Sequence, residues 1–333
     1  MLDLANNDVS KYLNEKHLAM NNITDEATRK TSMRLLNFYH ELLPNLVGGS
    51  ADVATSVMTD LINGTNFTPK TRHGTNINWG IREFFMAAGS NGILLHGGLR
   101  TYTGCFLVFS DYMKNAIRMS ALMKLPQIYL FSHDSLAVGE DGPTHQPIEQ
   151  LAGLRSIPNL NVFRPCDARE TYAAYRLALE STSTPSAIIL SRQNLPLLAN
   201  SSNYSSVKCG GYIIDHERGN SVDFTLIATG SEVSLAIEIK KYLLSLGIEI
   251  RVVSMPCQEL FDSQSNEYQA SVLGTDYAHR MAIEMESTFG WHKYAKYVMG
   301  INEFGMSGKA NDVINAFGFT KENISKIILK HIK

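Results

Sequence analysis

Three stretches of the sequence combine titratable side chains with glycine or proline, and chemistry is expected there first. The earliest is Gly-Gly-Ser-Ala-Asp-Val-Ala-Thr-Ser at 48–56. Its two glycines would let the backbone approach a ligand closely. Asp52 could hold a cation or a polar heterocycle, and Ser56 could donate a hydrogen bond to a phosphate. A helix cap at Ser50 or Asp52 explains the same residues without any ligand.

A second stretch, Trp-Gly-Ile-Arg-Glu at 79–83, places a carboxylate at the start of a predicted helix. An acid in the first turn ordinarily complements the helix dipole. A functional Glu83 would have to be buried beside a partner whose proton it controls.

The third stretch, 132–147, holds two histidines and three acids within thirteen residues. His133, Asp141 and His145 stand among glycines and prolines that keep the backbone irregular. Histidine can act near neutral pH as an acid, a base or a hydrogen-bond donor. A metal site is the alternative, but the two histidines lack the spacing of helical or finger-type zinc ligands. We therefore expect no metal ligands in this chain.

Two further features could contact a ligand. Phe106, Phe109 and Tyr112 are three residues apart, and on one predicted helix they would line one face. Such a face is either core packing or a stacking wall for a flat ring. Arg192 follows a predicted strand, where an arginine is either an anion clamp or half of a surface salt bridge.

The elements that would position these residues alternate between strands and helices. A helix capped by Thr24 or Asp25 should end at Pro44, and a short strand at 46–49 runs into the glycines. Further strands are expected at 127–131, near Val162, and at 186–190, 224–228, 248–253 and 280–284, with helices at 81–96, 107–123, from 147, 167–180 and from 230 to a cap at 247. The alternation predicts an α/β fold with mainly parallel sheets flanked by helices. Ligands bind such sheets beyond the carboxyl ends of the strands.

The polar run at 199–206 is the best linker candidate, because the pattern of strands and helices restarts after it. We expect two consecutive α/β domains, at 24–200 and 211–333, joined by a linker at 201–210. Residues 1–23 would form a polar N-terminal extension.

Composition excludes several classes of protein. The 333 residues carry a net charge of −2, which favours neither a nucleic-acid-binding nor a membrane-binding surface. No apolar run approaches the ~18 residues of a membrane span, and charged residues interrupt the first twenty positions, where a signal peptide needs an apolar core. Four cysteines more than forty residues apart fit neither a zinc site nor a disulfide scaffold. A cytoplasmic protein is expected.

The same stretches resemble a known family, in order. From Ala27 nearly to its end, the chain resembles the carboxyl-terminal half of transketolase. The motifs that carry the resemblance are Gly-Gly-Ser-Ala-Asp at 48–52, Gly-Ile-Arg-Glu at 80–83, His-Asp-Ser at 133–135, Gly-Glu-Asp-Gly-Pro-Thr-His-Gln-Pro at 139–147, Ser-Arg-Gln-Asn-Leu-Pro at 191–196, Ala-Thr-Gly-Ser-Glu-Val at 228–233 and Arg-Val-Val-Ser-Met-Pro at 251–256. One such motif would be weak, but the ordered series is specific.

The resemblance implies a pyrimidine-binding domain of the thiamine-diphosphate-binding fold, followed by a transketolase C-terminal domain. The family's diphosphate-binding domain carries Gly-Asp-Gly, which does not occur in this sequence. Thiamine diphosphate is therefore the implied cofactor, and Mg²⁺ or Ca²⁺ would be bound by a diphosphate-binding N-terminal half outside this sequence. In the family, the active site forms between those two domains on different subunits. The implied assembly is a homodimer, and this chain would be inactive without that half.

Roles for single residues also follow from the resemblance. Glu83 matches the glutamate at N1′ of the cofactor's aminopyrimidine, and Asp52 matches an aspartate near the thiazolium. Phe106, Phe109 and Tyr112 match the aromatic pocket around the pyrimidine. Asp141 and His145 match the groups beside the sugar hydroxyls and the reacting oxygens. The four groups that match the sugar-phosphate site are Arg29, Ser56, His133 and Arg192.

The function implied is the transfer of a two-carbon ketol unit between phosphorylated sugars in the pentose phosphate pathway. A dihydroxyacetone synthase-like ketol transferase and a non-catalytic assembly subunit are the alternatives. Phe84 stands where many relatives have histidine, so no catalytic role is expected for it. A Rossmann-type dehydrogenase is disfavoured, because no Gly-x-Gly-x-x-Gly follows a predicted first strand.

Overall fold

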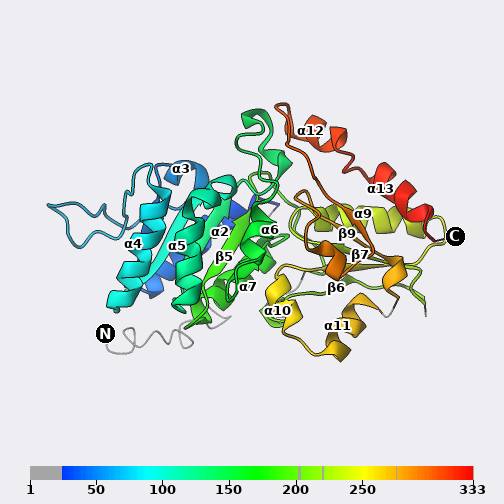
Figure 1. Ribbon diagram of the computed structural model, residues 1–333, viewed down its shortest axis with the longest axis horizontal. Helices are drawn as coiled ribbons and strands as arrows, with labels where there is room; N and C mark the ends of the chain where they lie inside the picture. The colour runs from blue at the N-terminus through cyan, green and yellow to red at the C-terminus, as the bar shows by residue number, and fades with distance from the viewer. Residues whose placement is uncertain (1–24, 202–203, 220, 275, 333) are drawn as a thin grey trace.

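The computed structural model describes residues 25–201, 204–219, 221–274 and 276–332, so the predicted extension at 1–23 lies outside it. Two sheets lie side by side along the long axis, each flanked by helices (Figure 1). This arrangement confirms the predicted α/β class with mainly parallel sheets. Within the described residues, none of the helices is both long enough and apolar enough to cross a membrane.

The first sheet has the strand order β1-β2-β3-β5-β4, and every neighbouring pair is parallel. Its strands are β1 (Leu46–Ser50), β2 (Arg100–Phe106), β3 (Ile128–Ser132), β4 (Asn161–Phe163) and β5 (Ser186–Leu190). The helices of this half are α2 (Thr28–Leu42), α3 (Ala54–Val57), α4 (Glu83–His96), α5 (Ser110–Leu122), α6 (Gln150–Arg155) and α7 (Ala168–Glu180), with 3₁₀ turns η3 (Leu107–Phe109) and η4 (Leu136–Asp141).

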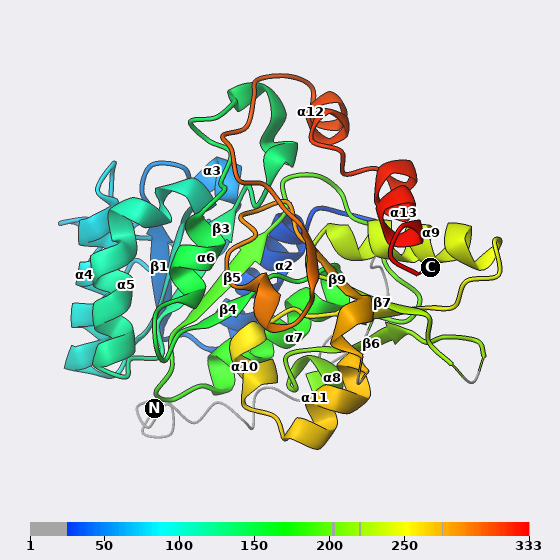
Figure 2. The ribbon, with the colours of Figure 1, turned by 45° about the vertical axis from the view of Figure 1, so that its right-hand side comes forward.

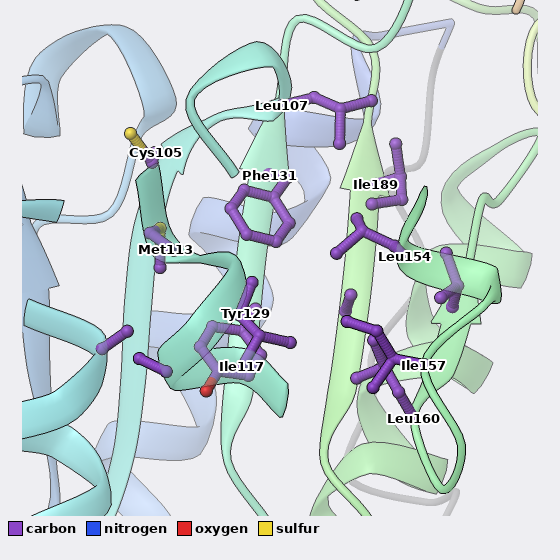
Figure 3. Close-up of a cluster of buried hydrophobic side chains, with 14 of the residues drawn as sticks. Cys105, Leu107, Met113, Ile117, Tyr129, Phe131, Leu154, Ile157, Leu160 and Ile189 are labelled. Carbon is purple, nitrogen blue, oxygen red and sulfur yellow. The ribbon is translucent and has the colours of Figure 1, made fainter. Parts of the chain in front are cut away.

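Alternate residues of the central strand β3 supply the cores on the two faces of this sheet. Ile128 and Leu130 pack with α2 and α7. Tyr129 and Phe131 pack with α4, α5 and α6 (Figure 3). Both faces are therefore covered, as a parallel sheet requires.

The second sheet has the order β10-β9-β7-β8-β6, and only β6 runs antiparallel, against β8. Its strands are β6 (Tyr212–Asp215), β7 (Phe224–Ala228), β8 (Ile250–Ser254), β9 (Arg280–Ile283) and β10 (Tyr297–Met299). The helices are α8 (Tyr204–Val207), α9 (Glu232–Leu244), α10 (Gln258–Asp262), α11 (Asn266–Leu273), α12 (Ala310–Ala316) and α13 (Lys321–Leu329), with 3₁₀ turns η5 (Tyr277–His279) and η6 (Trp291–Lys293). Helices α9 and α13 pack on one face of the sheet.

Several predicted boundaries were right, and others need correction. Strands β5 and β7 have the predicted bounds. Helix α2 begins at Thr28 after an Ala27 N-cap, so the predicted cap was wrong. Asp25 instead accepts a hydrogen bond from the backbone of Leu197 at 3.0 Å. The predicted linker contains the short helix α8.

The sequence did not predict strand β2, and its presence changes the arrangement of the three aromatic rings that were expected on one helix face. Phe106 ends β2, Phe109 ends the turn η3 and Tyr112 lies in α5, so the three rings do not share one helix. The strand is fully buried although it contains polar residues. Arg100 donates to the carbonyl of Leu179 at 3.0 Å, and Tyr102 donates to the carbonyl of Thr59 at 2.8 Å. Hydrogen bonds of this kind allow polar side chains to be buried.

A buried ionic cluster joins the two halves of the chain. Arg164 follows β4, is fully buried, and pairs with Asp134 at 3.0 Å and with Glu232 of α9 at 2.6 Å. Arg155 forms a bidentate ion pair with Glu284, which lies just after β9, at distances of 2.7 and 2.9 Å. These contacts fix how the second sheet sits against the first.

Candidate functional site

The carboxyl ends of four parallel strands carry most of the residues predicted to act. Asp52 follows β1, Phe106 ends β2, His133 follows β3 and Arg192 follows β5. Because these strands are parallel, their carboxyl ends meet at one edge of the sheet. The structure therefore brings together groups that lie up to 140 positions apart in the sequence.

A pocket of about 490 Å³ opens at this edge. It is lined by Ala51, Asp52, Val53, Ile81, Glu83, Phe109 and Tyr112. Glu83 is the first residue of α4 and is partly buried there. The walls are thus mainly apolar and carry two carboxylates, an arrangement that suits a flat, partly polar ring.

The glycines of β1 are required by close packing within the first domain, whether or not a ligand also approaches them. A Cβ at Gly48 would lie 2.2 Å from the Tyr102 carbonyl oxygen, and one at Gly49 would lie 2.0 Å from that of Ile77. Ser50 caps the local turn by accepting a hydrogen bond from the backbone of Val53. Asp52 does not cap, and it adopts a left-handed backbone with φ of 65° at the pocket wall.

A series of rings connects this pocket to the two histidines. Phe109 lies 6.0 Å from Tyr112 and stacks on Phe106 at 5.8 Å between ring centroids. Phe106 in turn lies 3.9 Å from the His133 ring, and Phe109 meets the edge of His145 at 5.4 Å. Phe106 therefore does not line the pocket itself but supports Phe109 and His133.

Cys105 is a buried residue of β2 that no sequence motif singled out. Burial, and then the negative charge of Glu83, raise the pKa of its thiol to about 12. The thiol is therefore neutral, and the Glu83 carboxylate lies close enough to influence it. Only its position beside Phe106 could have drawn attention to Cys105.

Positive charge gathers around His133 at the same edge. Burial, and then the charges of Arg29 and Arg192, lower the pKa of His133 to about 3, so its imidazole is neutral. The pKa of Arg29 is lowered as well, by burial and by Arg192. Two guanidinium groups that repel one another, together with a neutral imidazole that can donate a hydrogen bond, form a site suited to an anion.

Ser56, the remaining residue predicted for a phosphate site, contacts Arg29 through its backbone. The Ser56 carbonyl accepts a hydrogen bond from Arg29 at 2.6 Å, so Ser56 orients the guanidinium. The His133 ring is held by Ser132, whose Oγ lies 2.8 Å from Nδ1. His133 has φ of 64°, a constrained backbone of the kind found at functional sites.

Asp141 and His145 lie on the loop that follows His133. Asp141 is exposed at the end of η4, and His145 is partly buried with its Nδ1 2.9 Å from Thr144 Oγ1. The fully buried Gln146 follows them and was not singled out as a site residue. Across the ranges described by the structure, no group of three or more His, Cys, Asp or Glu side chains is arranged to hold a metal ion.

Comparisons with family models and with individual proteins point to the same family. The family described as "Transketolase, pyrimidine binding domain" matches residues 25–197, and "Transketolase-like TK C-terminal domain" matches residues 210–320. The transketolase of Bacillus subtilis is 48% identical over 303 residues, which are 90% of this chain and 45% of that protein.

Solved structures of transketolases are also similar to this chain. A transketolase of Pichia stipitis in complex with sedoheptulose 7-phosphate is 43% identical, with a TM-score of 0.88 over 92% of this chain and 46% of that chain. A split-gene transketolase, solved as an inactive β4 tetramer, is 24% identical with a TM-score of 0.73, over 92% of this chain and 98% of that chain, and shares the fold.

The chain spans about half the length of the curated relatives that it matches. The two matched regions follow one another in the order of the two sheets. The first of them alone covers more than half of the chain. The chain therefore belongs to the transketolase family.

Proposed function

We propose that this chain is the pyrimidine-binding and C-terminal part of a transketolase, which transfers a two-carbon ketol group between phosphorylated sugars. The observation that carries the proposal is one sheet edge on which a mainly apolar pocket with two carboxylates adjoins a cluster of positive groups. The pocket contains Glu83, and the cluster contains Arg29, Arg192 and His133. A cofactor ring and a sugar phosphate would thus lie side by side.

The pocket suits the aminopyrimidine of thiamine diphosphate. Its volume of about 490 Å³ accommodates a substituted pyrimidine, and the rings of Phe109 and Tyr112 offer flat apolar contact. When bound, this cofactor supplies the carbanion chemistry of ketol transfer. Glu83 would share a proton with the ring nitrogen, and Asp52 would face the thiazolium side. The diphosphate and its Mg²⁺ or Ca²⁺ would be bound by the partner half.

The positive cluster suits the phosphate of the sugar. Arg29 and Arg192 would pair with the dianion, while the neutral His133 would donate one hydrogen bond to it. Asp141 and His145, on the neighbouring loop, would contact the hydroxyls and the reacting oxygens. Binding at the phosphate would position the reacting carbon, because interactions remote from the chemistry orient a substrate.

An exposed apolar surface on α4 and α5 suits a partner. Phe84 and Leu95 of α4 are 55% and 60% exposed, and Leu122 of α5 is 64% exposed. A groove of about 290 Å³ runs between the two helices, adjoining the same α4 that begins at Glu83. Contiguous apolar patches of this kind mark protein interfaces. We propose that a diphosphate-binding half covers this surface within a homodimeric arrangement of such pairs.

The domain limits and the setting belong to the same proposal. The pyrimidine-binding domain would span 24–200, the linker 201–210 and the C-terminal domain 211–333. A cytoplasmic role in the pentose phosphate pathway would follow from the substrates. A dihydroxyacetone synthase-like activity would use the same cofactor residues but accept formaldehyde, and an assembly subunit would use none of them.

The experiment is a ketol-transfer assay with xylulose 5-phosphate and ribose 5-phosphate, in the presence of thiamine diphosphate and Mg²⁺. It is run on this chain alone and on this chain mixed with a diphosphate-binding half of a transketolase. Activity in the mixture alone supports the proposal. A complex that forms but transfers no ketol group supports the assembly subunit, and transfer to formaldehyde in place of ribose 5-phosphate supports the synthase.

A further inference from the structure

A segment of the second domain lies directly on the loop that carries Asp141 and His145. The loop spans 136–146, and the segment at 305–307 precedes α12. Both views show the loop, in green, beside the orange chain that leads into α12 (Figures 1 and 2). About 160 residues of sequence separate the two, so only the tertiary fold brings them together.

Gln146 makes the central contact. Its side chain is fully buried, and Nε2 donates to the carbonyl of Met306 at 2.9 Å. The same nitrogen faces two carbonyls of the loop, Gly139 at 3.1 Å and Leu136 at 3.4 Å. One amide group thus joins two turns of the loop to the second domain.

The segment at 305–307 leaves space for the Gln146 amide because residue 305 is a glycine. A Cβ at Gly305 would lie 1.9 Å from Gln146 Oε1 and 3.0 Å from Leu136 Cδ2. Ser307 adds a hydrogen bond from its hydroxyl to the carbonyl of Glu140, the residue before Asp141. A side chain at 305 would therefore have to displace the Gln146 amide from this position, and the contact extends along both ends of η4.

We infer that Gln146, Gly305, Met306 and Ser307 form a clasp through which the second domain positions the loop bearing Asp141 and His145. Gln146 is a positioning residue within this clasp. The loop needs such support because Gly139 and Gly142 have φ of 78° and 74°, and glycines in this region of the backbone leave a free loop many alternatives. The consequence for substrate binding rests on the proposed function, whereas the clasp itself does not.

The first test measures the loop directly in this chain by amide hydrogen exchange. The amides of Gly142 and Gln146 are bonded within the loop at 3.0 Å, so they report its order. In Gly305→Ala, the added carbon displaces the buried Gln146 amide and breaks its three hydrogen bonds. We expect these two amides to exchange at least about tenfold faster, while amides of β5 keep their rates.

Gly308→Ala is the matched control, because its added carbon meets only Val313 Cγ2, at 3.2 Å. This substitution should leave the hydrogen-exchange rates of the Gly142 and Gln146 amides unchanged. Unchanged exchange in Gly305→Ala, or equally faster exchange throughout the chain, would overturn the clasp.

The second test is a double-mutant cycle on the loop amides and on ketol transfer by the assembled complex. Gln146→Ala removes the group that Gly305→Ala would displace, so the double variant should resemble Gln146→Ala alone. Additive effects would mean that Gly305 acts independently of Gln146, which contradicts the inference.

In kinetics, each single variant should lose about tenfold to a hundredfold in kcat/KM for the ketose donor, because small displacements of a positioned group are costly. Hydrogen exchange at C2 of bound thiamine diphosphate depends on Glu83 and should stay near the wild-type rate. Loss of C2 exchange would indicate general disruption and overturn the positioning role. A wild-type complex that transfers no ketol group refutes the proposed function, while the amide measurements still decide the clasp.

Discussion

At the scale of single residues, charge and burial separate the two subsites. Glu83 is a partly buried carboxylate at the start of a helix, beside apolar rings. His133 is an imidazole that is kept neutral by burial first and then by the charges of two guanidinium groups. The first environment suits a proton shared with a ring nitrogen, and the second suits a dianion. The assignment of both residues stays a prediction that substitution can test.

Glu83→Gln tests the proton-sharing role. The substitution preserves shape but removes the carboxylate, so hydrogen–deuterium exchange at C2 of thiamine diphosphate in the assembled complex should slow by at least about 100-fold. The loss of a helix-dipole contact should cost only about 0.3–1 kcal/mol of unfolding free energy. Glu149→Gln, at an exposed position, is the matched control. Near-normal C2 exchange in the Glu83 variant would refute the assignment.

His133 should make stability depend on pH in a defined direction. Its pKa of about 3 in the folded chain lies below the ordinary 6.5, so between these values the unfolded chain binds a proton and the folded chain does not. The contribution of His133 to the free energy of unfolding therefore rises with pH across this window, is constant above it, and decreases as the pH falls from 6.5 towards 3.

Urea unfolding between about pH 4 and pH 6 measures this dependence. His133→Asn should reduce the slope by up to about 1.4 kcal/mol per pH unit. His73→Asn, at an exposed position, serves for comparison and should keep the wild-type slope. Equal slopes in the wild type and His133→Asn would mean that His133 is not held neutral.

At the scale of elements, α4 has two tasks. Its first residue lines the pocket, and its outer side is one wall of the apolar groove shared with α5. Met86 and Ala87 of the same helix are fully buried against the first sheet. A partner that covers the outer side would therefore also lie next to Glu83, which links assembly to completion of the site.

Phe84→Asp tests the surface formed by α4 and α5. Because Phe84 is 55% exposed, the substitution should change the free energy of unfolding by no more than about 0.5 kcal/mol. It should raise the Kd for a diphosphate-binding half at least about tenfold, as loss of an aromatic contact does. Sedimentation velocity measures the association. Leu246→Asp, 51% exposed just beyond α9, should not alter it. Unimpaired association of Phe84→Asp would place the partner elsewhere.

At the scale of the whole molecule, the two halves are held by buried charge as well as by apolar contact. Arg164 connects Asp134, beside His133, with Glu232 of the second domain. Trp291 donates a hydrogen bond to Glu284 at 2.6 Å, and this contact helps to hold the ion pair between Glu284 and Arg155. A buried cation that satisfies several carboxylates cannot be removed without leaving them unpaired.

Arg164→Met should accordingly lower the free energy of unfolding by about 3–5 kcal/mol, measured by urea denaturation. The control is Lys293→Met, which breaks a pair with Asp262 in which the lysine side chain is 59% exposed. Surface pairs of that kind contribute at most about 1 kcal/mol. If the two variants lost similar amounts of unfolding free energy, burial would not make the Arg164 ion pairs contribute more than a surface pair.

The sequence alone predicted the alternation of strands and helices, the bounds of β5 and β7, and the family. Those features depend on local hydrophobic periodicity and on contiguous motifs, which the order of residues records directly. The predicted site residues were named from the same motifs, and the parallel sheet brings the ends of their strands to one edge.

Only the tertiary structure revealed β2, because its buried polar side chains are satisfied by distant residues such as Thr59, in the loop after α3, and Leu179 of α7. The neutral state of His133, the Arg164 cluster and the contact of Gln146 with Met306 were likewise beyond prediction. Each depends on groups that lie far apart in the sequence and meet only in the folded chain, within the first domain for His133 and between the two domains for Arg164 and Gln146. Local patterns determine which face of an element is buried, whereas packing determines what that face meets.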